Sequence, residues 1–324
     1  MLRISKLYIV NVVFVLALCS LGFSGCGKEN RDSTENTEKG YNVKDEISEN
    51  APGSEVVSNG NDNIDIGTEE YNFINKSGKT IKDRINTPKD FKRVKYGIKS
   101  FGYFLENYPL YKDGKKVVLY DGTKKMNQSD HIAVFRMKLA DGDLQQCADS
   151  VMRLYAEYLY SIEEYDKISF HLVNGFACDY SKWRQGMRVA VSGDDTSWVK
   201  SEAASNSKKI LEGYLRFVFA YASTLSMEKE SKRINKKDIE AGDIFIYGGS
   251  PGHVVMVLDV CESKDGEKAF LLGQGYMPAQ QFHVLKNPLH EDDPWYYVKE
   301  ILYPFQTPEY TFDKGSLKRP EYLG

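Results

Sequence analysis

Motifs for the common cofactors and metals are missing from this 324-residue chain. It has no Walker loop and no GxGxxG turn, so the usual nucleotide- and dinucleotide-binding sites are excluded. It has no CxxC, HxH or HExxH spacing either, which argues against a structural zinc site. The sequence therefore predicts neither a cofactor nor a metal ion.

A large excess of basic charge is also missing. The formal net charge is −3, and residues 27–70 alone contribute −8, from 12 acidic and 4 basic side chains. The first 26 residues carry +2, which leaves only +3 on residues 71–324. This excess is too weak to indicate nucleic-acid binding. Nothing in the sequence points to a particular oligomeric state.

One long apolar run stands near the start, after Arg3 and Lys6, and ends in "FSGC" at Cys26. A basic start, an apolar stretch and small residues before a cleavage point predict an export signal over residues 1–26. The "FSGC" stretch resembles the lipobox of bacterial lipoproteins, in which the cysteine is acylated after cleavage. The resemblance implies a protein held by membrane lipid through Cys26 on the outer face of the bacterial cell membrane. The alternative is an uncleaved membrane helix.

The rest of the chain divides by composition. Residues 27–70 are polar and acidic with almost no aromatic side chains, which predicts a disordered tether. Residues 71–324 form the expected single domain, in which helical patterns precede three strand patterns, "DIFIYGG", "HVVMVLDV" and "AFLLGQGY". We also expect a hairpin of residues 115–122 with 131–139, and a long helix over about 206–227. The pattern indicates the α+β class.

A histidine opens the second of those strands. The stretch "IEAGDIFIYGGSPGHVVMVLDV" resembles the NlpC/P60 and related papain-like cysteine hydrolases, in which a Gly-Asp strand leads to the catalytic histidine. The resemblance implies a papain-like domain, a helix packed on an antiparallel sheet, with His253 as the catalytic base. If the chain turns at Lys264 and Asp265, the strands before and after the turn pair so that His253 lies opposite Gln274 or Gly275. Gln274 is therefore expected to orient the imidazole. The alternative is that His253 only makes a hydrogen bond to a neighbouring loop.

The neighbouring "GGSPG" fits the GxSxG pattern of serine hydrolases. In that pattern the residue after the serine donates a backbone N–H to the oxyanion. Here that residue is Pro251, which has no N–H, so Ser250 is rejected as a nucleophile.

A cysteine nucleophile requires a thiol at the start of a helix, where the helix dipole favours the thiolate. Cys147 meets this condition if Asp143 caps the helix, and Gln145 and Gln146 are then candidate oxyanion donors. Cys147 is also spaced like an ordinary core residue of that helix.

Two other cysteines lie in the domain. Cys178, in "ACDYS", also precedes a short helical stretch and is the rival nucleophile. Cys261, at the far end of the histidine's strand, is expected to be structural.

Four stretches together are similar to the DUF4846 family over roughly residues 85–305. They are "LQQCADSVMRLYAEYLY", "NGFACDYSKWRQGMRV", "GDIFIYGGSPGHVVMVLDV" and "LLGQGYMPAQQFHVLKNP…PWY". Our first hypothesis is a surface cysteine amidase or peptidase acting on cell-wall peptides or other peptide amides through Cys147, His253 and Gln274. The alternatives are a non-catalytic lipoprotein binding a glycan or peptide through its many aromatic side chains, and an acyl transferase using the same residues.

Overall fold

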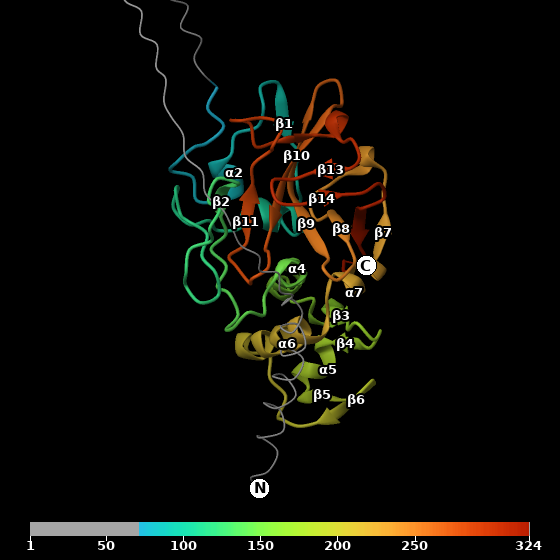
Figure 1. The fold of residues 1–324 in the computed structure, drawn as a ribbon. Helices are drawn as coiled ribbons and strands as arrows, with labels where there is room; N and C mark the ends of the chain where they lie inside the picture. The colour runs from blue at the N-terminus through green and yellow to red at the C-terminus, as the bar shows by residue number, and fades with distance from the viewer. Residues whose placement is uncertain (1–70, 324) are drawn as a thin grey trace, which may run out of the picture. The chain divides into compact units, whose positions relative to one another are not determined.

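A computed structural model of the chain describes residues 71–323, which belong to one compact unit. An antiparallel sheet with helices packed beneath it makes up this unit, which confirms the α+β class (Figure 1). The expected signal peptide with Cys26 and the acidic tether lie outside the described residues. Within residues 71–323, no helix has both the length and the hydropathy needed to cross a bilayer.

The main sheet has nine strands in the described chain, with the order β2-β11-β10-β9-β8-β15-β7, while β1 pairs with β9 and β12 with β10. All of these pairings are antiparallel. The strands are β1 (Phe91–Arg93), β2 (His131–Val134), β7 (Ser231–Arg233), β8 (Ile244–Tyr247), β9 (His253–Ser263), β10 (Lys268–Gln274), β11 (His283–Leu285), β12 (Tyr296–Tyr297) and β15 (Leu317–Pro320).

The two faces of this sheet bury different apolar cores. Because successive side chains of a strand point to opposite faces, Val254, Met256 and Leu258 of β9 share one core with the helix that carries Cys147. Val255 and Val257 join the second core, on the other face. That core includes Phe305 and Phe312 from a small hairpin, β13 (Phe305–Gln306) and β14 (Thr311–Phe312).

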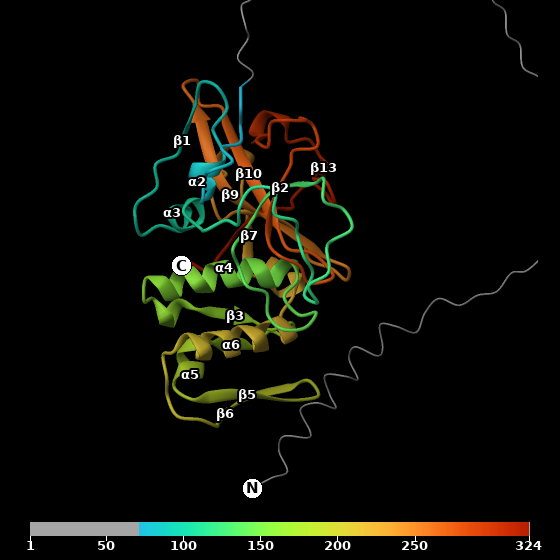
Figure 2. The ribbon, with the colours of Figure 1, turned by 90° about the vertical axis from the view of Figure 1, so that its left-hand side faces the viewer.

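Helix α4 (Cys147–Ser161) lies between the sheet and a lower layer of secondary structure (Figure 2). Burial on both sides explains why apolar side chains cover so much of its surface. The lower layer contains α5 (Tyr180–Arg184), α6 (Lys208–Tyr221) and the hairpins β3 (Ser169–His171) with β4 (Ala177–Asp179) and β5 (Met187–Ser192) with β6 (Asp195–Lys200). The remaining helices are α2 (Ile81–Arg84), α3 (Phe101–Glu106) and α7 (Thr224–Lys229).

Two of the expected elements are wrong. The single helix over about 206–227 is two helices, because the Ser223 hydroxyl accepts the N–H of Leu225 at 3.1 Å and starts α7. The hairpin of 115–122 with 131–139 does not form, since β2 pairs with β11 from the other end of the domain. In the 115–122 stretch the structure has only isolated bridges.

Candidate active site

The start of α4 brings Cys147 to the end of the central strands. Cys147 is the first residue of α4, four positions beyond the expected cap, because Gln146 takes the N-cap position and donates its N–H to Asp149 at 2.9 Å. Asp143 instead accepts the N–H of Ala279 at 2.7 Å, which holds the loop after β10 against this helix end. Gly275 is packed tightly there, because an added Cβ would lie 2.8 Å from Ser150 Oγ.

The Gly-Asp pair before β8 also fixes α4 in place. Tyr155 of α4 donates its hydroxyl to the carbonyl of Gly242 at 2.6 Å, and Gly242 has a φ of 101° that favours glycine. Asp243 pairs with Arg319 at 2.7 Å. Gly242 and Asp243 therefore have a structural role, because they join α4 and β15 to the start of β8, the strand next to β9.

The Cys147 side chain is a buried free thiol. Burial raises the pKa of the thiol to about 12 and the Asp149 carboxyl adds to this, while backbone N–H groups of Ala148 and Val254 lower the pKa. The side chain is 6% exposed. Val254 directly follows His253 in β9, the strand against which α4 packs.

His253 and Gln274 are hydrogen bonded, with 2.8 Å between Nε2 of the ring and Oε1 of the amide. The expected register is off by one or two residues, because a bulge between Leu271 and Leu272 leaves Gly273 opposite Met256. Gln274 is therefore diagonal to His253 rather than directly opposite. Diagonal neighbours two residues apart share a face of the sheet, so the long amide side chain still reaches the ring.

Aromatic side chains enclose the imidazole of His253. The ring centroids of Tyr276 and Tyr310 lie 4.7 and 4.8 Å from that of His253, and Phe312 lies behind at 6.0 Å. Burial lowers the pKa of His253 to about 4, although the bond to Gln274 opposes this. The imidazole is thus neutral at pH 7.

Two tyrosines lie beside the ring of His253. The pKa values of Tyr276 and Tyr310 are raised, chiefly by burial, and the charged form of Cys147 adds to both increases. Among the described residues no hydrogen bond joins the Cys147 sulfur to the His253 imidazole.

Further polar groups that sequence reasoning missed lie behind Gln274. Its Nε2 donates to Glu309 at 2.6 Å, and Glu309 also pairs with Lys125. His283 Nε2 lies 3.5 Å from Gln274 Nε2 and 3.9 Å from the Glu309 carboxylate. These residues come from three distant segments, and no local pattern in the sequence relates them.

The expected oxyanion donors differ in their availability. Gln145 is fully buried, and its amide nitrogen already donates to Met137 and Ser150 while its oxygen accepts from Arg153 at 2.8 Å. Gln145 is therefore not free to serve as a donor, which corrects that expectation. Gln146 remains half-buried, and its amide donates only to Asp143 at 3.2 Å in this structure.

The other cysteines lie away from His253, and all three in the described chain are free thiols. Cys178 is on β4 and not at the start of α5, whose cap is Asp179. Burial raises its pKa to about 12, and Tyr214 donates to its carbonyl at 2.6 Å. Cys261 pairs with Arg93 and Ala269 near the opposite end of β9.

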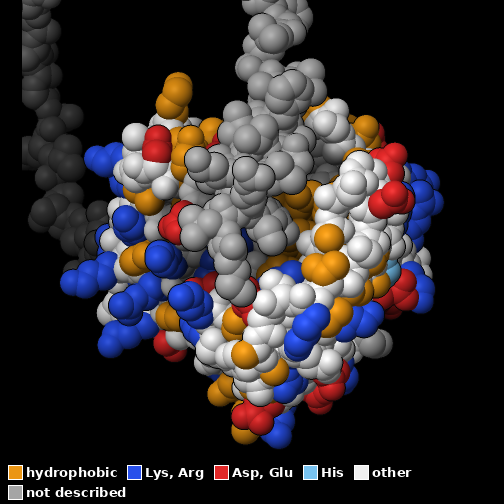
Figure 3. Space-filling model, turned by 90° about the horizontal axis from the view of Figure 1, so that it is seen from below, with side chains coloured by type: hydrophobic (Ala, Val, Ile, Leu, Met, Phe, Trp, Pro, Cys, Tyr) orange, Lys and Arg blue, Asp and Glu red, His pale blue; other side chains and the backbone are white. Residues whose placement is uncertain are grey.

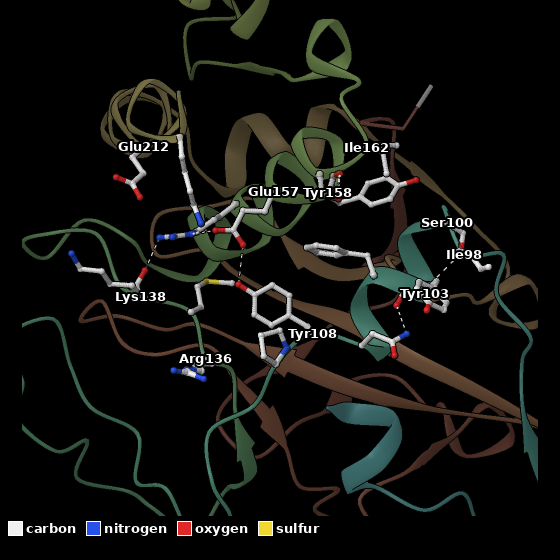
Figure 4. A pocket seen from close by; sticks show the side chains of 17 residues that line it. Ile98, Ser100, Tyr103, Tyr108, Arg136, Lys138, Glu157, Tyr158, Ile162 and Glu212 are labelled. Atoms are coloured by element: carbon white, nitrogen blue, oxygen red, sulfur yellow. Dashed lines mark hydrogen bonds and ion pairs between the residues drawn. The ribbon is translucent and has the colours of Figure 1, made fainter. Parts of the chain in front are cut away.

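A cavity of about 690 Å³ lies along the other end of α4 (Figure 4). Apolar, polar and charged side chains line it, and Glu157 among them accepts from Tyr108 and Arg153, both at 2.8 Å. Arg136 and Lys138 lie at its margin, and basic side chains gather on one flank of the lower end of the molecule (Figure 3). No cysteine or histidine lines this cavity, so it contributes no nucleophile or base.

Comparison with known proteins assigns the chain to a family. The family model described as "Domain of unknown function (4846)" matches residues 81–319. The chain belongs to this family. The match runs from α2 to β15 and so includes both the start of α4 and the strands carrying His253 and Gln274. No curated protein and no solved structure matches the chain significantly.

Proposed function

We propose that this protein is a cysteine amidase or peptidase with a variant of the papain-like fold. One observation carries the proposal: the buried ring of His253 is hydrogen bonded through Nε2 to Gln274, and Cys147 is the first residue of α4, the helix that packs against the strand of His253. The proposed nucleophile, the base and the group that orients the base thus belong to elements that pack against one another.

The proposed reaction is the hydrolysis of an amide. The Cys147 sulfur attacks the carbonyl carbon while Nδ1 of His253 takes the thiol proton, and an oxyanion forms on the carbonyl oxygen. The C–N bond then breaks, and His253 gives that proton to the leaving amine. Water hydrolyses the resulting thioester, again with His253 as the base, and restores the thiol.

The charge state of the two groups defines the type of catalysis. Because the pKa of Cys147 is raised to about 12 and that of His253 is lowered to about 4, the resting pair is a neutral thiol and a neutral imidazole. The imidazole would therefore act as a general base during attack, and no preformed thiolate is required. Gln274 Oε1 would stabilise the imidazolium that forms.

The surroundings support a substrate with rings or extended side chains. Tyr247 pairs with His253 across β8 and β9 and is 52% exposed, and Tyr276 and Tyr310 are half-buried beside the ring. Such side chains can stack on sugar rings or on peptide groups. With the proposed export and acylation of Cys26, cell-wall peptide is the substrate class that we propose.

A second candidate is a surface lipoprotein that binds a glycan or peptide without reaction. The observation that favours it is the burial of both reactive groups, with Cys147 at 6% and His253 at 3% exposure. In that case the aromatic side chains would form the binding surface, and Cys147 and His253 would be inert core residues.

Product analysis tests the enzyme. The full chain would be incubated with peptides released from cell walls, and mass spectrometry would detect new amine and carboxylate ends. We expect products from the wild-type protein and from Cys178→Ala, and none from Cys147→Ala. Products from Cys147→Ala would exclude the proposed nucleophile.

Chemical labelling separates the enzyme from the binding protein. A peptide carrying an electrophilic carbonyl mimic should label Cys147 of the folded protein, with Cys178 unlabelled, if the site accepts a peptide for attack. Labelling of either thiol only after denaturation, together with saturable retention of unmodified wall fragments, would favour the binding protein.

A further inference from the structure

We infer that Glu309 is a positioning residue, which fixes the direction of the Gln274 amide and, through it, the tautomer of His253. The consequence for catalysis rests on the proposed function, whereas the effect on the histidine does not. The inference follows from which groups along this buried chain can donate a proton and which can only accept one.

The first step concerns the amide of Gln274, which is fully buried. Its two ends are nearly the same size, so its direction is set by its hydrogen-bond partners. One end lies 2.6 Å from Glu309 Oε2, and an ionised carboxylate can only accept. The NH2 group must therefore face Glu309, and the oxygen must face His253.

The second step concerns the ring. Gln274 Oε1 lies 2.8 Å from His253 Nε2, and an amide oxygen can only accept. Nε2 therefore carries the proton in the neutral ring. Nδ1 is left with a free electron pair, which is the form that can take a proton from a thiol.

Glu309 is held in its ionised, acceptor-only form. Burial alone would raise its pKa, but His283 and Lys125 outweigh this effect and lower the pKa to about 2. The turn that carries Glu309 is fixed as well, because Thr307 donates its N–H to the carbonyl of Tyr310 at 2.9 Å. Tyr276, next to the ring, donates its hydroxyl to the carbonyl of Glu309 at 3.3 Å.

His283 lies beside the same end of the amide. Its Nδ1 lies 2.9 Å from the carbonyl of Gln281, which can only accept, so Nδ1 donates this hydrogen bond. Its Nε2 is 3.5 Å from Gln274 Nε2. Glu309 is thus the charged acceptor at the NH2 end of Gln274, and its removal would remove the strongest hydrogen bond there.

The direct test measures the tautomer. Ring nitrogen NMR on the full chain, at a pH near 7.5, would report which nitrogen of His253 carries the proton. We expect the wild-type ring to be protonated on Nε2 only, and Glu309→Ala to give a mixture of both tautomers. Glu309→Gln keeps an acceptor oxygen of similar size without the charge, so we expect a smaller change and a well-folded protein.

Glu300→Ala is the matched control. Glu300 lies 2.9 Å from His290 Nε2 on the surface, so this variant removes a glutamate beside a different histidine. The His253 signals should not change in it. If His253 stays protonated on Nε2 alone in both Glu309 variants, the inference is wrong.

Kinetics then separates the inference from the proposed function. If the protein hydrolyses wall peptides, Glu309→Ala should lower kcat by on the order of 10- to 100-fold with KM changed by less than about 2-fold, as for other residues that orient a catalytic group. A tautomer change in a protein without activity would support the positioning role and reject the hydrolase. Activity together with an unchanged tautomer would reject the positioning role alone.

Discussion

Two regions of the molecule each contain a cysteine and a histidine, and they differ in how the chain presents them. In the first region, Cys147 starts α4, which packs against β9, and His253 starts β9 with Tyr276 and Tyr310 beside its ring. In the hairpin of β3 and β4, Cys178 lies opposite Phe170, and His171 follows one residue later. Burial raises the pKa of both thiols to about 12, so the acidity of the thiols does not distinguish the regions.

Strand geometry does distinguish them. Successive side chains of a strand alternate between faces, so Cys178 and Phe170 point inward while His171 points outward. The His171 side chain is 47% exposed and bonds Glu230 at 2.6 Å, away from any thiol. A cysteine and a histidine close together in a hairpin therefore do not suffice for the proposed chemistry. The proposed pair also requires the start of a helix to pack against the strand that carries the histidine.

The largest expected effect compares the two histidines. His253→Ala removes the proposed base, so we expect the rate of wall-peptide hydrolysis to fall on the order of 1,000-fold or more, within the range for general-base residues. His171→Ala removes a histidine from the other region and should change the rate by less than about 2-fold. Rates would be measured as kcat/KM with one purified peptide. A comparable loss in both variants would mean that the effect is structural.

The second effect is on stability as a function of pH. The pKa of His253 is about 4 when folded and about 6.5 in an unfolded chain, so between these values the unfolded state binds more protons. The free energy of unfolding therefore falls as the pH drops through this window, by about 3 kcal/mol from this group.

The variant His253→Gln isolates that contribution. Asp149 and Asp259, with pKa values raised to about 8 and about 6, act in the opposite direction, but they are present in both proteins. We expect wild type to lose about 3 kcal/mol relative to the variant between pH 7.5 and pH 4 in urea unfolding. Parallel pH curves for the two proteins would show that His253 is not buried in its neutral form.

Much of the candidate site could be predicted because it depends on local patterns. The strand beginning at His253 and the amide at Gln274 were indicated by a polar residue within an apolar run, and the structure joins the two. The pairing register of β9 with β10 could not be predicted from the sequence, because the bulge between Leu271 and Leu272 leaves no distinctive sequence pattern. The length of the glutamine side chain compensates for that error.

The start of α4 illustrates a different limit. Asp143 and Gln146 match a capping box, yet Gln146 and Asp149 make the cap that forms. Two overlapping boxes are compatible with the sequence, and the loop after β10 decides between them by using Asp143 for Ala279. A long-range contact thus overrides a local preference.

Glu309 could not have been predicted at all. It lies 35 positions after Gln274, on a turn whose residues show no unusual pattern, and its partner Lys125 comes from a loop before α4. The same holds for β2, which pairs with β11 rather than with the nearer 115–122 segment. Contacts between distant segments depend on the whole fold, and a single sequence does not encode them in any short stretch.

The smallest expected effect compares two glycines, one beside the start of α4 and one within α6. Gly275 is closed in by α4, with Ser150 Oγ at 2.8 Å and the carbonyl of Gln146 at 2.9 Å from an added Cβ. Gly275→Ala should therefore separate α4 from β10 and destabilise the protein by about 1–3 kcal/mol. The same change should reduce hydrolysis, because the helix start that carries Cys147 would shift.

Gly213 provides the matched substitution, because it lies within α6 and an added Cβ would meet nothing within 4 Å. Gly213→Ala should stabilise the protein by roughly 0.5–1 kcal/mol, since alanine favours the helix interior. Urea unfolding of both variants gives the comparison directly. Suppose that Gly275→Ala were as stable as wild type and fully active. The close packing of the β10 end against the start of α4 could then not be what positions Cys147. The approach of α4 to the strand of His253 would require another cause.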